Sequence, residues 1–355
     1  MSIKSNDKRK NILKAIRFER PDFIPMTFHI NDACWQYYPQ DDLSELIESH
    51  KFLFPDYIRP EGRYTPNFAA VARKDAPFTD DWGCVWETTI DGITGTVTRH
   101  PLADWSAFEN YKAPDPNTCM GIGPIDWNSV EKEIAAQKEK GDITYGGLRH
   151  GHTFLQLCDI RGYQNLILDM ADEEPNLMKL ISMVEEFNMA IVNKYLAIGV
   201  DILTYPEDLG MQNGPMLSPE HFRRYIKPSY QRLMKPARDK GIIVHMHSDG
   251  YIRDLVDDLI DGGVEIINLQ DLVNGIDWVA SKFAGKVCVE LDIDRQSITV
   301  NGTPQQVDAL VREEVEKIGR KEGGLMMIYG LYPGTPLENV KALMDAMEKY
   351  AFYFN

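Results

Sequence analysis

The chain has 355 residues, 43% of them hydrophobic, which is enough to bury the core of one large α/β domain or of two ordinary ones. Its formal net charge is −16 without a run of Lys and Arg, which disfavours nucleic acid and anionic membranes as partners, because both need clustered cations. The polar start, the five scattered cysteines without a CxxC motif, and the lack of an apolar stretch of about 18 residues predict a soluble cytoplasmic enzyme with reduced thiols.

The N-terminal region carries one clear helix pattern and one clear strand pattern. Residues 6–18 are amphipathic with a helical period, and residues 23–32 alternate as a strand that ends in polar residues. His29 and Asn31 share one face of that strand, and we expect both to face a site. A loop histidine and an asparagine turn are the alternative interpretation.

A segment rich in aromatic residues follows this strand. Residues 33–75 contain many Tyr, Phe, Trp and Pro residues without a clean period. The part up to residue 64 is too aromatic for a free surface, so we expect it to cover the mouth of a barrel or to form a subunit contact in a homodimer. Residues 79–100 indicate a β-hairpin with an Asp-Gly turn, and residues 128–140 indicate a charged helix.

From about residue 141 onward, strand and helix patterns alternate with short loops. The expected strands cover residues 143–147, 200–205, 242–249, 265–269, 286–291 and 325–329. The expected helices cover residues 176–197, 218–240, 252–261, 277–283, 303–318 and 335–350, and a Thr303–Gln306 capping box opens the fifth. This order favours parallel strands with crossover helices, so we predict one domain over residues 1–355, a TIM-type (β/α)8 barrel with an N-terminal extension and insertions. A doubly wound sheet is the second choice, but no GxGxxG or P-loop motif follows any strand.

The strongest candidate site is the stretch GIIVHMHSDG at residues 241–250. Its apolar run is typical of a strand buried on both faces, and it leads into His245, His247 and Asp249. Side chains alternate along a strand, so these three share one face if the strand stays regular. Two imidazoles and a carboxylate on one face can bind a metal or move protons. A core histidine and a helix-capping aspartate are the alternative interpretation.

In a barrel, polar residues at the carboxyl ends of the strands gather at one mouth. The side chains expected there are His29, Asn31, Arg149, His150, Glu207, His245, His247, Asp249, Gln270, Glu290, Asp292 and Tyr329. Glu290 and Asp292 share a strand face and are predicted to be catalytic, as a general acid or a substrate clamp, with helix capping as the alternative. The residues predicted to bind the substrate are His29, Asn31, Arg149 and Tyr329.

Five blocks of the sequence resemble the uroporphyrinogen decarboxylase superfamily in their order and spacing. The blocks are EDLGMQNGPMLSPEHFRRYIKPSY (207–230), VHMHSDG (244–250), LIDGGVEIINLQD (259–271), LDIDRQ (291–296) and PGTPLENV (333–340). The resemblance covers residues 200–355 best and implies a fold similar to a distorted TIM barrel. The superfamily divides into porphyrinogen decarboxylases and zinc-dependent methyltransferases that work with corrinoid proteins.

The resemblance favours the methyltransferase branch. Decarboxylases carry an arginine-rich RQAGRYLP segment that holds the substrate carboxylates, whereas FHINDACWQYYP at residues 28–39 has no arginine. The thiol-activating methyltransferases hold zinc with a His-x-Cys on the central strand and a later Cys. His247 matches that histidine, but Asp249 stands at the cysteine position and residues 329–333 contain no cysteine.

This departure implies a harder ligand set of imidazoles and carboxylates. The resemblance therefore predicts zinc held by His247 together with two of Glu207, His245 and Asp249. Glu207 is otherwise a helix cap or an ion-pair partner, and His245 is otherwise a residue that orients a ligand. Such a site suits a methyl ether or methylamine, whose methyl group passes to the cobalt of a corrinoid (cobalamin) carried by a partner protein. An O-demethylase of anaerobic metabolism is the preferred interpretation.

Two other functions compete with this interpretation. A metal-independent decarboxylase or lyase, acting on a porphyrinogen-like or other carboxylated substrate, would use carboxylates and Arg149. A non-catalytic binder of a small ligand would use the same barrel. A stoichiometric transition metal and methyl transfer to cobalt(I) distinguish the first interpretation from both alternatives.

Overall fold

The structure is a computed structural model that describes residues 5–355. The chain divides into two compact units. Unit 1 contains the N-terminal residues through Ala69, Ile90–Ile93 and Ile267–Asn355, and unit 2 contains Ala70–Thr89 and Thr94–Ile266. The single-domain organisation expected from the sequence stays a prediction. No helix in the described part of the chain is long and apolar enough to cross a membrane.

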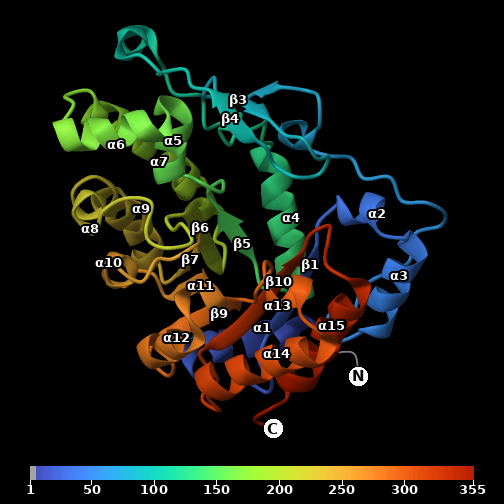
Figure 1. The fold of residues 1–355 in the computed structure, drawn as a ribbon. Coiled ribbons are helices and arrows are strands. Elements are labelled where there is room, and N and C mark those ends of the chain that lie inside the picture. The colour runs from blue at the N-terminus through green and yellow to red at the C-terminus, as the bar shows by residue number, and fades with distance from the viewer. Residues whose placement is uncertain (1–4) are drawn as a thin grey trace. The chain divides into compact units, whose positions relative to one another are not determined.

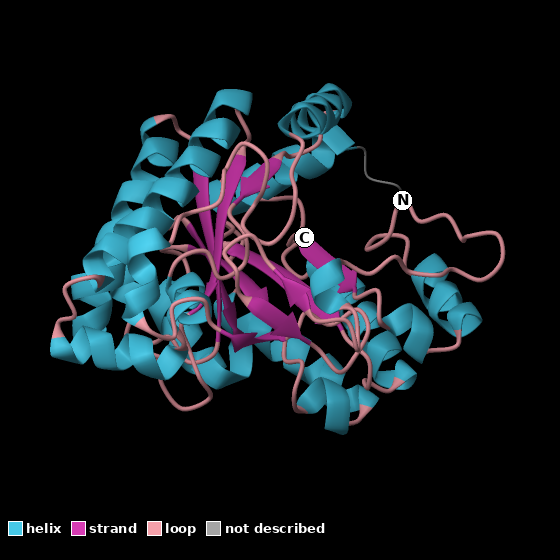
Figure 2. Ribbon diagram, turned by 90° about the horizontal axis from the view of Figure 1, so that it is seen from above, coloured by secondary structure: helices cyan, strands magenta, loops and turns pink. Residues whose placement is uncertain are grey.

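The main sheet is parallel, and its strand order is β1-β10-β9-β8-β7-β6-β5. Helices alternate with these strands along the chain and flank them in Figure 2. The predicted TIM-type α/β class is therefore confirmed. Within the described residues this sheet has seven strands, where a regular barrel has eight.

Unit 1 joins an N-terminal strand to three strands from the end of the chain (Figure 1). Its strands are β1 (Met26–Ile30), β8 (Ile266–Gln270), β9 (Cys288–Asp292) and β10 (Leu325–Leu331). Its helices are α1 (Ser5–Arg17), α2 (Cys34–Tyr37), α3 (Gln40–Ser49), α11 (Asp271–Asn274), α12 (Ile276–Phe283), α13 (Ile298–Asn301), α14 (Pro304–Ile318) and α15 (Leu337–Ala351). The predicted capping box is confirmed, because Thr303 accepts the Gln306 N–H and Gln306 accepts the Thr303 N–H.

Unit 2 contains the remaining parallel strands and the predicted hairpin. Its strands are β5 (Tyr145–Gly147), β6 (Ile202–Asp208), β7 (Ile243–Asp249) and the antiparallel β2 (Phe78–Thr79), β3 (Val85–Glu87) and β4 (Thr96–Arg99). Its α-helices are α4 (Trp127–Lys140), α5 (Phe154–Arg161), α6 (Tyr163–Asp172), α7 (Leu177–Ile198), α8 (Pro219–His221), α9 (Lys227–Asp239) and α10 (Val256–Gly262). Shorter helical segments are η1 (Ala70–Ala72), η2 (Trp105–Asn110) and the π-helical η3 (Phe222–Ile226).

The long helix α7 illustrates how the sequence builds this unit. Its buried positions include Leu180, Val184, Phe187 and Ile191, whose spacing of three to four residues forms one apolar stripe. That stripe packs α7 against α9 and β5, and each fully buried aliphatic side chain contributes about 1.5–3 kcal/mol. The helix ends where Gly199 adopts a left-handed conformation (φ +79°), which glycine tolerates without steric cost.

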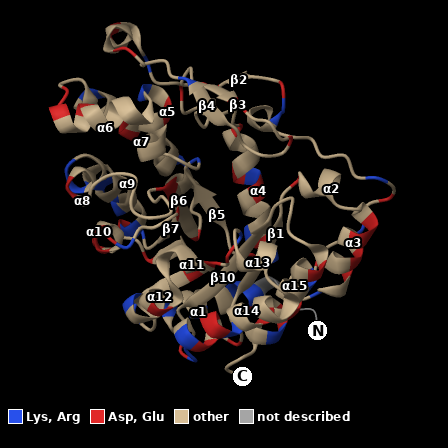
Figure 3. Cartoon of the chain, in the orientation of Figure 1, with Lys and Arg blue, Asp and Glu red and all other residues tan. Residues whose placement is uncertain are grey.

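Charged residues of both signs are interspersed along the helices in Figure 3. Several form pairs one helical turn apart, such as Lys317 with Glu313 at 2.6 Å in α14 and Lys341 with Asp345 at 2.6 Å in α15. Each such exposed pair stabilises a helix by only a few tenths of a kcal/mol. The net charge of −16 is thus a property of the surface and has little influence on the fold.

Candidate metal centre

Three side chains from neighbouring strands of unit 2 converge on one point. His150 follows β5, Asp208 is the last residue of β6, and His247 lies near the end of β7. The His150 Nε2 and His247 Nε2 atoms lie 3.3 Å and 3.5 Å from Asp208 Oδ1. One potential ligand atom from each residue lies within 4.8 Å of those of the other two. The arrangement offers two imidazole nitrogens and one carboxylate oxygen to a single ion.

The alternation of side chains explains why Asp208 and His247 meet. From residue 204 onward in β6, the even-numbered residues are partly exposed and the odd-numbered ones are buried. From residue 245 onward in β7, the odd-numbered residues are partly exposed and the even-numbered ones are buried. In the parallel register, Pro206 lies opposite His247 and Asp208 lies opposite Asp249. The predicted common face of His245, His247 and Asp249 is therefore confirmed, and Asp208 of β6 lies on the same side of the sheet.

Asp208 is the negative centre of this cluster. Burial by itself raises the pKa of Asp208. Hydrogen bonds from His150 and His247 lower this pKa by more than burial raises it, so that it lies well below its usual range. The same Oδ1 atom also accepts the backbone N–H of Asp249 at 3.1 Å. Asp208 is therefore ionised at neutral pH, and the three side chains stay partly accessible to solvent.

The donor set fits zinc. Zinc is commonly held by imidazole nitrogens and carboxylate oxygens at about 2.0–2.1 Å, and in a tetrahedral site these atoms lie about 3.4 Å from one another. The separations of 3.3 Å and 3.5 Å around Asp208 Oδ1 match this spacing. Asp249 Oδ1 lies 3.5 Å from His247 Nε2, the nitrogen that also faces Asp208, so Asp249 is placed to join the set. His245 lies two residues earlier on β7, opposite Thr204.

Glu207, a predicted ligand, points to the opposite face of β6 and is completely buried. Its carboxylate accepts the backbone N–H groups of Thr153, Phe154 and Leu155 at 3.0, 2.9 and 3.1 Å, and the Tyr230 hydroxyl at 2.8 Å. Burial raises its pKa, and these hydrogen bonds oppose the rise. Glu207 thus caps the first turn of α5, which was its alternative interpretation. A metal-binding role for Glu207 stays a prediction that this geometry does not favour.

Arg149, a predicted substrate residue, is buried beside the cluster. Its Nη2 donates to Asp159 Oδ2 at 2.8 Å, and its Nη1 lies 4.0 Å from Asp80 Oδ2. Its Nε donates to the His150 carbonyl at 3.0 Å, and its guanidinium lies 5.6 Å from the Trp86 ring centroid. These contacts hold the backbone of His150 in place. Substrate binding by Arg149 stays a prediction.

The predicted catalytic carboxylates belong to unit 1. Asp292 ends β9, is nearly buried, and accepts a hydrogen bond from Arg295 Nη2 at 2.7 Å. The Glu290 carbonyl accepts a hydrogen bond from the Asn268 side chain at 2.7 Å. Burial lowers the pKa of His29 on β1. The negative charge of the Glu290 carboxylate opposes this shift but does not cancel it. The catalytic and substrate-binding roles of Glu290, Asp292 and His29 stay predictions.

The two remaining predicted substrate residues have structural contacts in unit 1. Asn31 Oδ1 accepts the Ala33 N–H at 2.8 Å, which is the asparagine turn of its alternative interpretation. Tyr329 is almost completely buried, and its ring lies 5.2 Å from that of Phe28. These contacts account for both residues without a substrate, so their binding roles stay predictions.

Sequence reasoning placed His150 at the mouth but left it out of the ligand set, and it left out Asp208 as well. The expected strand over residues 200–205 stopped before Glu207 and Asp208, so the alternation that places these two side chains on opposite faces was not applied to them. The strand runs to Asp208, so the rule applied to β7 also selects Asp208 on β6. That signal was present in the sequence.

Comparison with known proteins identifies the family. The sequence profile "Uroporphyrinogen decarboxylase (URO-D)" matches residues 91–350, most of the chain. The chain belongs to the uroporphyrinogen decarboxylase family. This confirms the resemblance found in the sequence motifs.

Similar proteins include both branches of this family. Uroporphyrinogen decarboxylase from Thermus thermophilus is 29% identical over 140 residues, which are 38% of each chain. Methylcobamide:CoM methyltransferase MtaA from Methanosarcina barkeri is 25% identical over 174 residues, which are 46% of each chain. The matched part thus spans less than half the length of these curated relatives. The structure of a methyltransferase from Methanosarcina mazei superimposes with a TM-score of 0.67 over 97% of this chain and 98% of that one, at 18% identity, and so supports the fold.

Proposed function

We propose that this protein is a zinc-dependent methyltransferase that moves a methyl group from a small methylated substrate to the cobalt of a corrinoid protein. The observation that carries the proposal is the cluster of His150, Asp208 and His247 at the ends of three adjacent strands. The carboxyl ends of barrel strands are the usual location of active sites in this class of fold. Similarity to a methylcobamide methyltransferase supports the proposal.

Zinc is expected to be held by His150 Nε2, His247 Nε2 and an oxygen of Asp208, with Asp249 in reach. When bound, zinc supplies a Lewis acid that polarises the atom from which the methyl group departs. The set contains two imidazoles, a carboxylate and no thiolate, so it is harder than a cysteine site. A departing oxygen suits it better than a departing sulfur, and a methyl ether is therefore the proposed methyl donor.

Other residues of unit 2 fix the cluster from behind. The Arg149 side chain donates a hydrogen bond to the His150 carbonyl. A few residues after His150, the backbone N–H groups of residues 153–155 donate hydrogen bonds to the Glu207 carboxylate. The segment that carries His150 is thus fixed at both ends. A preorganised ligand loses little conformational entropy when it binds the metal, which favours a stable catalytic site. The corrinoid protein is expected to dock over the carboxyl ends of the strands.

Decarboxylation of a carboxylated substrate is the second candidate. The similarity to the Thermus thermophilus relative supports it, since that protein is a uroporphyrinogen decarboxylase. A substrate with several carboxylates requires several cations at the site. Residues 28–39 contain no arginine, and Arg149 is already paired with Asp159. This charge arrangement favours methyl transfer over decarboxylation.

The test is metal analysis of the purified protein, followed by methyl transfer. We expect about one zinc per chain in the wild type, and much less in His150→Ala, Asp208→Asn and His247→Ala. His221→Ala is the matched control, because His221 lies in α8 outside the cluster. Iron in place of zinc would contradict the zinc assignment, since two histidines and one carboxylate also suit ferrous iron. Methyl transfer from an aryl methyl ether to cobalt(I) cobalamin, followed by absorbance, tests the reaction, and decarboxylation without transfer would favour the second candidate.

A further inference from the structure

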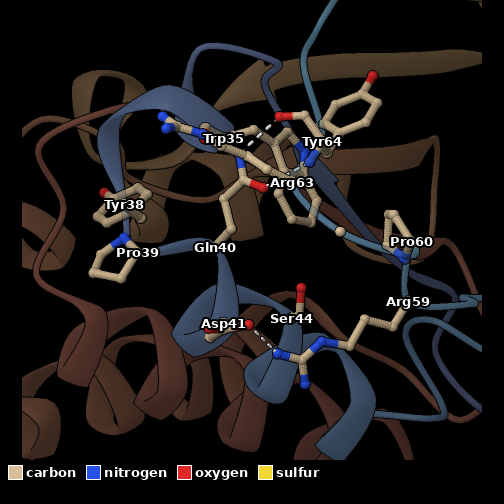
Figure 4. Close-up of a pocket in the computed structure, with 11 residues that line it drawn as sticks. Trp35, Tyr38, Pro39, Gln40, Asp41, Ser44, Arg59, Pro60, Arg63 and Tyr64 are labelled. Atoms are coloured by element: carbon tan, nitrogen blue, oxygen red, sulfur yellow. Dashed lines mark hydrogen bonds and ion pairs between the residues drawn. The ribbon is translucent and has the colours of Figure 1, made fainter.

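A pocket of about 570 Å³ lies in the N-terminal part of unit 1 (Figure 4). Its residues come from α2, from α3, from residues 38–39 between these helices and from the loop at 59–64. They belong entirely to unit 1, whereas the candidate metal ligands belong to unit 2. Small-molecule sites commonly measure about 300–1,000 Å³. The pocket therefore has the size of a ligand site.

Aromatic rings form one wall of this pocket. The rings of Trp35 and Tyr64 lie 5.5 Å apart at 74°, an edge-to-face contact, and both side chains keep part of their surface accessible. Tyr38 also lines the pocket, and its hydroxyl donates to the Thr335 carbonyl at 2.7 Å, which anchors α2. An anchored aromatic wall offers a face or an edge to a flat ring at little entropic cost.

Most polar side chains in the pocket are already engaged. Gln40 donates to the Trp35 and Tyr64 carbonyls at 2.6 and 2.8 Å and accepts the Tyr64 N–H at 2.9 Å. Arg59 pairs with Asp41 and lies 3.5 Å from Glu48. Gln40 therefore holds the two aromatic residues together, and the Arg59 charge is compensated.

Arg63 is the cation that this arrangement leaves for a ligand. It lines the pocket at an exposed position, beside Tyr64. No carboxylate in the described part of the chain pairs with its guanidinium, unlike that of Arg59. A planar guanidinium binds a carboxylate through two parallel hydrogen bonds. On a protein with a net charge of −16, such a cation is a specific feature for an anion.

We propose that this pocket binds a small aromatic carboxylate, whose ring packs on Trp35 and Tyr64 and whose carboxylate pairs with Arg63. A neutral sugar fits less well, because sugar recognition needs several unengaged donors and acceptors, and those of Gln40 and Asp41 are occupied. The proposal does not depend on the proposed methyl transfer, since it uses none of the residues of the metal cluster.

The experiment is isothermal titration of the full-length protein with benzoate as the probe, alongside benzyl alcohol and acetate. We expect saturable benzoate binding, with benzyl alcohol and acetate weaker by about tenfold or more, because each lacks one of the two recognised groups. Arg63→Gln is expected to weaken benzoate binding about tenfold or more, and Trp35→Leu to weaken it as well. Arg17→Gln, at an exposed arginine of α1, is the matched control and is expected to bind normally.

Benzoate could also bind zinc through its carboxylate. A titration of protein made metal-free with a chelator therefore distinguishes binding in this pocket from binding at the metal centre. Unchanged benzoate affinity after chelation supports the pocket, and its loss overturns the proposal. Binding that is insensitive to Arg63→Gln in a protein with unchanged circular dichroism overturns it too. So does an absence of saturable binding up to about 10 mM benzoate, since a paired and stacked ligand is expected to bind more tightly than that.

Discussion

Two groups of side chains that contain acidic residues follow strands of the same parallel sheet, yet their surroundings are opposite. The first group is His150, Asp208 and His247, and the second is Asp271, Asp294 and Glu314. In unit 2, Asp208 faces the imidazoles of His150 and His247 and remains partly accessible. In unit 1, Asp271 follows β8 and is completely buried beside Glu314 of α14. The first group is arranged to receive a cation, and the second is arranged to retain a proton.

In the second group, backbone N–H groups compensate the charge of Asp271, and burial favours the protonated form of Glu314. Asp271 accepts the N–H of Leu272 and that of Asp294, and its carboxyl lies beside that of Glu314. Burial raises the pKa of Glu314 well above its usual range, and the neighbouring Asp271 raises it further. Asp294 in turn accepts the N–H groups of Ser297 and Thr299. A carboxylate at a strand end is therefore a potential ligand only where imidazoles and solvent replace backbone donors.

The largest expected effect comes from removing an imidazole of the first group. His247→Ala is expected to lose zinc and to slow methyl transfer to cobalt(I) about a hundredfold or more, because the departing oxygen loses its electrostatic assistance. The melting temperature is expected to change little, since the side chain is partly exposed. Transfer rates of wild type, His247→Ala and His221→Ala at saturating zinc give the answer. A fully active, zinc-loaded His247→Ala protein would remove the basis of the proposed function.

A second prediction concerns Glu207, whose neighbour Asp208 belongs to the metal cluster. Glu207→Gln puts an amide donor against backbone N–H groups and is expected to lower the free energy of unfolding by about 2–3 kcal/mol. The zinc content of the folded protein is expected to stay at the wild-type level, because the Glu207 side chain faces α5. Urea unfolding and metal analysis on one preparation measure both quantities. Normal stability with loss of zinc would instead make Glu207 a ligand.

Much of the fold was predictable because its signals are local. The alternation of strand and helix patterns, the capping box at Thr303 and the face shared by His245, His247 and Asp249 all depend on short-range periodicity. Helix α5 was not predicted, because six of its eight residues are buried and no polar face gives it a helical period. Its position depends on Glu207, which is distant in sequence.

The site was harder to predict, because it depends on where strands end and on contacts between distant residues. A difference of three residues in the end of β6 decides whether Glu207 or Asp208 faces the cluster. The aromatic segment was expected to cover the barrel mouth or to form a subunit contact. Three of its aromatic residues, Trp35, Tyr38 and Tyr64, line the pocket of unit 1, whereas Tyr37 is 60% exposed. Both expected roles stay predictions.

The raised pKa of Glu314 predicts a pH dependence of stability. Because burial raises the pKa of Glu314, the folded protein keeps a proton that the unfolded chain releases above its ordinary value of 4.5. The stabilisation is complete below that value and is lost as the pH rises through the folded-state pKa, at about 1.4 kcal/mol per pH unit. Glu314→Gln is expected to flatten this decline. The test is to measure the free energy of unfolding of both proteins in urea between about pH 4 and 9, a range that covers the raised pKa of a buried carboxyl. Equal declines of this free energy with pH in the two proteins would show that Glu314 does not titrate in this range.

The smallest expected effect distinguishes a carboxylate that binds the metal from one that lies just outside the ligand shell. Asp249 Oδ1 lies 3.5 Å from His247 Nε2, whereas Asp208 Oδ1 lies close to both imidazoles. If Asp249 stays outside the ligand shell, Asp249→Asn is expected to weaken zinc binding only about tenfold, which is the usual cost of losing a group just outside that shell. Asp208→Asn is expected to cost considerably more, because it removes the charge that both imidazoles face. Competition with a chelator gives both zinc affinities. Equal losses in the two variants would make Asp249 a ligand of the same rank as Asp208, and the first group would then hold zinc with two carboxylates.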